Sequence, residues 1–122
     1  MDGPIDLEAL PVAAAGPGVE IRATEAGALT VSLVRLEKGH DARPLFAGLP
    51  GDLCQCPHWG YVISGELRVW TASGFDDYHA GQAFHWPPGH APEALTDTSF
   101  LEISPTVELA KLYAHLERRA AG

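Results

Sequence analysis

Hydrophobic and polar residues alternate over two stretches in the first third of the chain. The period is two in residues 19–23 (Val-x-Ile-x-Ala) and again in residues 29–33 (Leu-x-Val-x-Leu), which places the apolar side chains on one face of a β-strand. Residues 25–27 (Glu-Ala-Gly) lie between the two stretches and predict a turn. Leu36 falls out of phase with the second stretch, which indicates a β-bulge before it.

Short apolar segments continue through the middle of the chain at roughly ten-residue spacing. Residues 61–63 and 67–71 flank Ser64-Gly65, and this arrangement predicts a β-hairpin in which Gly65 supplies the positive φ of the turn. Residues 83–86 and 100–103 predict further strands. Many short strands with no helix between them predict an all-β, antiparallel sandwich or barrel rather than a parallel α/β fold.

The two ends of the chain depart from this pattern. Residues 1–18 end in small residues and prolines without periodicity, which predicts an arm outside the core. Residues about 106–119 predict a C-terminal amphipathic α-helix. Its apolar stripe consists of Leu109, Leu112, Tyr113 and Leu116. This stripe would cover either one mouth of a barrel or a second subunit, and we expect a single domain over residues 19–122.

Composition narrows the function classes. The chain has 122 residues, with 8 Lys and Arg against 16 Asp and Glu, so its formal net charge is −8. This charge disfavours binding to nucleic acid, because a phosphate backbone needs a basic surface. The apolar runs are far shorter than the ~20 residues that span a bilayer, so no membrane partner is expected. Asp2, Asp6 and Glu8 replace the basic start of a secretory signal, and we expect a cytoplasmic protein.

The densest cluster of reactive side chains lies in residues 52–58 (Asp-Leu-Cys-Gln-Cys-Pro-His). A disulfide between Cys54 and Cys56 would be strained, whereas two thiols and His58 on one face of an extended segment suit a transition metal. Thiolate and imidazole favour Zn²⁺, Fe²⁺, Ni²⁺ or Cu over Mg²⁺ and Ca²⁺. Two alternatives stay open: the cysteines are core residues, or they form a metal-free redox pair.

Two glycine-anchored segments resemble the cupin superfamily. Residues 81–89 (Gly-Gln-Ala-Phe-His-Trp-Pro-Pro-Gly) fit the second cupin motif, G-x5-P-x-G, and residues 58–65 (His-Trp-Gly-Tyr-Val-Ile-Ser-Gly) fit the later half of the first motif. The chain is similar to small bacterial cupins with C-x-C-P-H-W-G-Y-V and P-P-G-H in these places. The resemblance implies an antiparallel jelly-roll barrel, or double-stranded β-helix, with a metal inside and a homodimeric assembly.

The ligand positions that the resemblance implies are not conventional in this chain. Counting back from Gly65, the usual first-motif ligands fall on Asp52, Cys54 and His58, and the second-motif histidine falls on Pro92, with His90 two residues earlier. The nearby metal-binding side chains are Cys54, Cys56, His58 and His90. They suggest a divalent ion, zinc, with iron, nickel, manganese and copper as alternatives. Four protein ligands would close the site, whereas three would leave a position for water or substrate.

Other polar residues are less informative. Asp52 is expected in a loop, although it could instead support an imidazole, and His40 is expected to be solvated. His85 lines the site or not according to strand register, and Glu93 could carry a proton near the mouth of the barrel. Three functions remain open: a metal-dependent enzyme acting on a small organic molecule, a non-catalytic metabolite- or metal-sensing module, and a protein with a structural metal. The fold alone does not choose among them.

Overall fold

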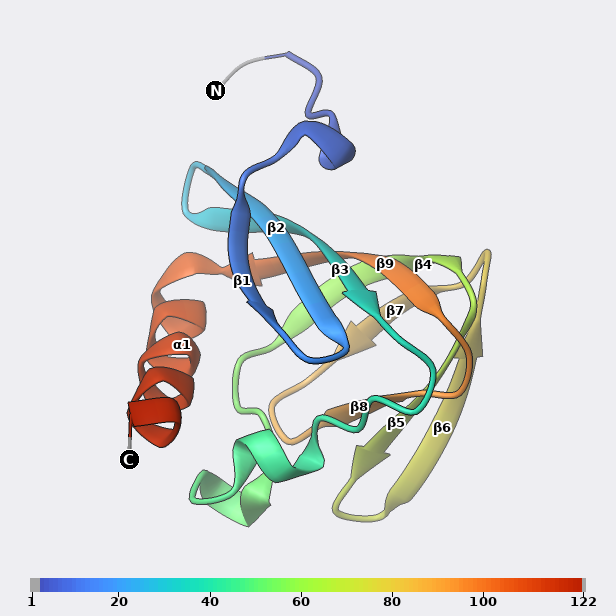
Figure 1. The fold of residues 1–122 in the computed structure, drawn as a ribbon, viewed down its shortest axis with the longest axis vertical. Coiled ribbons are helices and arrows are strands. Elements are labelled where there is room, and N and C mark those ends of the chain that lie inside the picture. Colours follow the sequence, from blue (N-terminus) through green and yellow to red (C-terminus); the bar gives the residue numbers. More distant parts are fainter. Residues whose placement is uncertain (1–2, 122) are drawn as a thin grey trace.

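A computed structural model describes residues 3–121, so residues 1 and 2 of the predicted arm, Asp2 among them, and residue 122 of the predicted domain lie outside the described residues. Within 3–121 the chain forms antiparallel sheets of six strands (β1-β2-β3-β9-β4-β7) and three strands (β6-β5-β8), which enclose a jelly-roll barrel (Figure 1). The strands are β1 Val12–Gly16, β2 Val19–Ala26, β3 Leu29–Leu36, β4 His58–Ser64, β5 Glu66–Thr71, β6 Gly74–His79, β7 Ala83–Trp86, β8 Ala91–Ala94 and β9 Thr98–Pro105. Three 3₁₀ helices, η1 Leu7–Ala9, η2 Arg43–Phe46 and η3 Pro50–Asp52, and the α-helix α1 Thr106–Ala121 complete the described elements.

The expected bulge before Leu36 is absent from the described chain. β3 pairs without interruption with β2 and with β9 from Leu29 to Leu36. Leu36 and Val34 belong to the core face, whereas Leu33 lies on the opposite face, where η1 packs against β2 and β3. The change of phase in the sequence therefore marks a strand with an apolar residue on each face, not an extra residue.

The predicted arm is wrong for residues 12–16. These residues form β1, which pairs with β2 along the edge of the larger sheet. None of them is buried, so the small side chains carry no apolar periodicity. The strand is held by main-chain hydrogen bonds, and a hydrophobic pattern does not report these.

The predicted hairpin at Gly65 is also wrong, because its two strands belong to different sheets. β4 pairs with β7 and β9, whereas β5 pairs with β6 and β8. Gly65 does have the positive φ that its turn requires, +86°. A Cβ at this position would lie 2.3 Å from the carbonyl oxygen of Asp97, so glycine lets the corner between the sheets pack against the segment that leads into β9.

The C-terminal helix forms as predicted and covers one end of the barrel (Figure 1). Its Leu109 and Leu112 pack with Phe46 and with the two cysteines. The Nε2 of His115 hydrogen-bonds to the carbonyl oxygen of Ala47, at 3.0 Å. The apolar stripe of the helix therefore covers the mouth of the barrel, the first of the two alternatives left open by the sequence. Across residues 3–121, no helix is long and apolar enough to cross a membrane.

Candidate metal centre

The backbone brings Cys54 and His90 together from distant parts of the chain. The amide of Cys54 donates to the carbonyl of His90 at 2.9 Å, and the amides of Gly89 and His90 both donate to the carbonyl of Cys54. His58 begins β4 and lies opposite Trp86 of β7, which places it beside this bridge. Three segments, 54–58, 86–90 and β9, therefore meet at one end of the barrel.

Cys54, His58 and His90 form a compact buried group. One ligand atom from each residue lies within 4.8 Å of the other two, and the Sγ of Cys54 lies 3.8 Å from the Nε2 of His58. Their exposed fractions are 0%, 4% and 2%. One thiol and two imidazoles at this separation match the donor atoms and spacing of a transition-metal site.

His90 offers the clearest sign of a missing partner. Its Nδ1 lies 2.8 Å from the carbonyl oxygen of Pro87, and because a carbonyl only accepts, Nδ1 carries the proton and donates it. Nε2 then carries no proton and has a free lone pair. This atom is buried and has no hydrogen-bond partner among the described residues. A buried, unprotonated imidazole nitrogen is the donor that a metal ion requires, so the residues fit such an ion.

His58 is oriented by polar groups on β9. Its Nδ1 lies 2.7 Å from the Oγ of Ser104 and 3.5 Å from an oxygen of Glu102, which leaves Nε2 directed at Cys54. Burial lowers the pKa of His58 to about 3, with the neighbouring His90 adding to the shift, and burial lowers the pKa of His90 to about 4. Both imidazoles are therefore neutral near pH 7, which is the form that binds metals.

Cys54 is a thiol in the absence of a cation. Burial raises its pKa to about 12, and its Sγ lies 3.8 Å from the carbonyl oxygen of Cys56. A cation would have to displace this proton, because the thiolate is the ligand form. Binding at this site would accordingly release one proton from sulfur.

Cys56 lies apart from the group, although the sequence placed it on the same face. Its Sγ lies 3.6 Å from the carbonyl oxygen of Pro57, and its side chain is buried against α1, lining a separate hollow with Glu108 and Lys111. The reason is local: the chain bends at Cys56 and resumes regular strand geometry only at His58. Among the four predicted ligands, the structure assembles Cys54, His58 and His90.

Glu102 is a functional candidate that the sequence analysis missed. It lies on β9 between Leu101 and Ile103, and burial raises its pKa to about 8. Its side chain lines a cavity of about 90 Å³ beside Cys54, His58 and His90. The available signal was the period-two set Phe100, Glu102 and Ser104, which shares the inward face of the strand.

Asp52, His85 and Glu93 lie away from the ligand group, whereas His40 lines the cavity beside it. Asp52 is in η3 and accepts from the amide of Gly48, as expected of a loop residue. His85 stacks on Trp59 on the outer face of the sheet. Glu93 accepts from the Nε1 of Trp70. His40 corrects the expectation of a solvated residue, since it is half-buried and lines the cavity.

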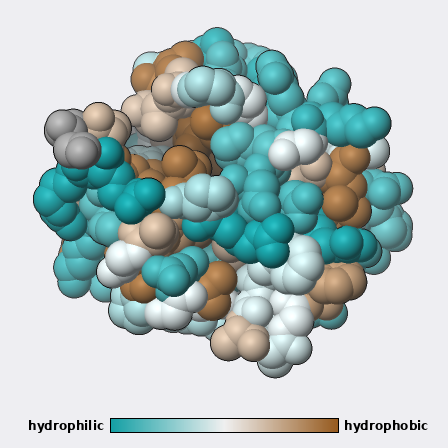
Figure 2. Space-filling view, turned by 60° about the horizontal axis from the view of Figure 1, so that its bottom comes forward, coloured by the Kyte–Doolittle hydropathy of each residue, from teal (hydrophilic) through white to brown (hydrophobic). Residues whose placement is uncertain are grey.

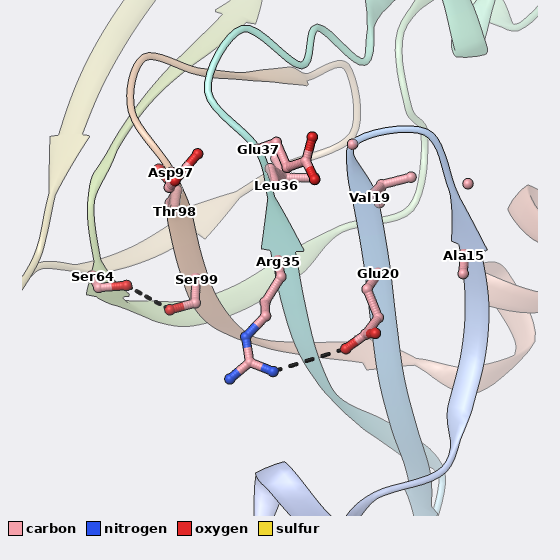
Figure 3. Close-up of a pocket in the computed structure, with 12 residues that line it drawn as sticks. Ala15, Val19, Glu20, Arg35, Leu36, Glu37, Ser64, Asp97, Thr98 and Ser99 are labelled. Atoms are coloured by element: carbon pink, nitrogen blue, oxygen red, sulfur yellow. Dashed lines mark hydrogen bonds and ion pairs between the residues drawn. The ribbon is translucent and has the colours of Figure 1, made fainter.

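A larger surface groove is not part of this site. It has a volume of about 630 Å³ and is lined by residues of β1, β2, β3, β4 and β9 (Figure 3). Its Arg35 pairs with Glu8 and lies 3.8 Å from Glu20, and its Ser64 and Ser99 bond to each other. The basic residue that lines the groove, Arg35, is thus paired within the protein, and the other charged residues that line it, Glu20, Glu37 and Asp97, are acidic.

Comparisons with known proteins give the fold. No protein-family model and no curated protein match the chain. An RmlC-like cupin from Shewanella frigidimarina is similar in structure, with a TM-score of 0.63, 18% identity and coverage of 86% of this chain and 92% of that chain. KdgF from Halomonas sp. has a TM-score of 0.63 and 19% identity, with coverage of 86% and 94%. An oxalate decarboxylase from Bacillus subtilis with Mn(II) centers has a TM-score of 0.54 and 23% identity, with coverage of 72% of this chain and 25% of that chain. The chain therefore has the cupin fold, as its two motifs predicted.

Proposed function

We propose that this cupin binds a divalent metal, zinc, through Cys54, His58 and His90, and acts as an enzyme on a small organic molecule. The observation that carries the proposal is the unpartnered, buried Nε2 of His90 within the ligand group. The mixture of sulfur and nitrogen donors supports zinc over harder ions. The Mn(II) centers of the oxalate decarboxylase support a divalent metal in this fold, and manganese, iron, nickel and copper are the competing ions.

The position of Cys56 supports a catalytic site over a structural one. Three protein ligands leave a tetrahedral ion one position for water or substrate, whereas four would close it. A bound metal would supply Lewis acidity, by polarising an oxygen or activating a water molecule. The protein's own part is to hold the ligands: Ser104 fixes the Nδ1 of His58, and the carbonyl of Pro87 fixes the Nδ1 of His90. Glu102, whose pKa lies near neutrality, can hold or release a proton at its carboxyl group.

The enclosure of the group favours a second candidate function. The ligand residues are at most 4% exposed, and α1 covers this end of the barrel. A metal so enclosed would also suit a non-catalytic module that senses the metal or a metabolite, or one in which the metal is structural. The two functions differ in whether a coordination position is open.

Cobalt substitution tests the ligand set. Protein purified without an affinity tag is expected to hold one metal per chain by elemental analysis, and Co²⁺ in its place is expected to show one sulfur-to-cobalt absorption band. Cys54→Ser should abolish this band, and the matched variant Cys56→Ser should retain it. A band lost equally in both variants would contradict the three-residue site.

Added azide then separates the two functions. A change in the visible bands of the cobalt protein indicates an open position and supports the enzyme. Unchanged bands would support the closed, non-catalytic module instead.

We also propose a cytoplasmic homodimer. Both cysteines are free thiols, which supports a reducing compartment. Trp59, Tyr61 and Ile63 are each more than two-fifths exposed along β4, and exposed apolar surface of this kind is common where subunits meet. Sedimentation equilibrium of wild type and Tyr61→Glu tests the assembly: the wild type should be dimeric and the variant monomeric.

A further inference from the structure

We propose that the cavity beside Cys54, His58 and His90 selects a small, uncharged molecule with an apolar body, and rejects organic anions. This inference rests on the proposed function in naming the substrate class of the same site. Its physical basis is the size, lining and charge of the cavity, and each of these is a property of the protein without metal.

Size sets the first limit. The cavity measures about 90 Å³, and since a cavity of ~150 Å³ accommodates benzene, this one accepts a molecule smaller than benzene. Leu45 lines the cavity and is 40% exposed, so it marks the edge that opens to solvent. Figure 2 shows hydrophobic residues in a hollow on one face of the molecule.

The walls favour an apolar body. Aliphatic and aromatic side chains come from both β2 and β3 and from the covering helix, among them Ile21, Val34, Leu109 and Leu112. A sugar or polyol would leave hydroxyl groups buried against these side chains without partners, which costs free energy for each group. A short alkyl group fits the same walls without this cost.

Charge excludes anions. The described residues that line the cavity include no Lys and no Arg; the basic nitrogens there belong to the imidazoles of His40, His58 and His90, and Glu102 supplies a carboxyl group. In neither protonation state does that carboxyl give an anion a positive partner. A divalent cation would not fully compensate, because the thiolate of Cys54 cancels one of its two charges and the carboxylate of Glu102 can cancel the other. A neutral ligand with an N–H or O–H group could instead donate to Glu102.

Two probes of nearly equal shape test the inference. Propanamide and propanoate each have five non-hydrogen atoms and differ in charge, and hexanamide is a longer neutral control. Binding is followed by NMR through the indole N–H signals, in metal-free and in zinc-loaded protein. Trp86 lines the cavity and reports on it, whereas Trp59 on the outer face serves as the internal control.

Propanamide is expected to shift the Trp86 signal without shifting Trp59, with a dissociation constant at least tenfold lower than that of propanoate; hexanamide should not bind. Glu102→Gln should narrow the difference between the two probes, since the amide of Gln carries no charge and can donate an N–H to propanoate. Equal or tighter binding of propanoate, or no Trp86 shift with propanamide in either form, would overturn the inference. Selective propanamide binding in a protein that retains no metal would uphold it while the proposed enzyme fails.

Discussion

The two ends of the barrel interior are built on opposite principles. At one end, Val62, Leu67 and Phe84 belong to an apolar cluster, in which Phe84 stacks at 3.8 Å on Trp86, a residue that borders the cavity. At the other end, two histidines, the thiol of Cys54 and the largely buried Glu102 lie beside a cavity. Burying polar groups costs free energy, and apolar packing offsets that cost. The packed end therefore stabilises a fold whose other end is polar and incompletely filled.

Leu67→Ala gives the largest expected effect. Leu67 is fully buried in the packed end, and its truncation should lower the free energy of unfolding by about 2–5 kcal/mol through lost burial and a new cavity. Urea titration measures this loss, and elemental analysis of the folded fraction should show unchanged metal content. A parallel loss of metal would show that the two ends are not independent.

Ser104→Ala tests the polar end of the barrel. Without the 2.7 Å bond to Ser104, His58 loses its orientation, and metal affinity should fall about 10–100-fold, as measured by competition with a chelator. Ser32→Ala is the matched control, because Ser32 lies opposite Glu102 on the neighbouring strand and its buried hydroxyl has no partner among the described residues. If both variants bind metal equally, the hydrogen bond does not position His58.

Glu102→Gln should change how stability depends on pH in chelator-treated protein. The pKa of Glu102 is raised by burial to about 8 from an ordinary value of 4.5. Between these values the folded state keeps a proton that the unfolded chain has lost, so wild-type stability falls as pH rises. The variant lacks this contribution. The stability of wild type relative to the variant should therefore decrease from pH 5 to pH 8.5 in urea titrations; a constant difference would contradict the raised pKa.

His115→Ala is expected to have the smallest effect. Its bond to the carbonyl of Ala47 ties α1 to the loop beside the cavity, and one such bond contributes about 1 kcal/mol to stability. Thermal unfolding should detect this loss, and faster hydrogen exchange in α1 should accompany it. His79→Ala, at an exposed strand end, should leave both measurements unchanged.

The strands of the packed end and the final helix were readable from the sequence because their apolar residues repeat at the period of the element. β1 was not, since its small residues bury no face and its stability comes from pairing with β2. The course of the chain after Gly65 was not predictable either, because a glycine turn has the same sequence pattern whether it joins paired strands or crosses between sheets. Both failures concern interactions between distant segments, which local periodicity does not encode.

The sequence predicts the types of residue in the candidate site, but not which of them lie together in the structure. Cys54, His58 and His90 were named from motif spacing, and the structure brings them together. An extended chain would place Cys56 beside these three residues, but the bend at Cys56 directs its side chain away from them. Glu102 was missed because its neighbours in the sequence are apolar, although it shares the inward face of the strand with Ser104.

The main-chain pairing of Cys54 with His90 bears on when the ion is acquired. Amide and carbonyl groups join these two residues without using either side chain, so two of the three proposed ligands are in place before any ion arrives. Metal loading is then expected to follow folding. The ion that the site takes would accordingly depend on the metal pool that the folded protein meets.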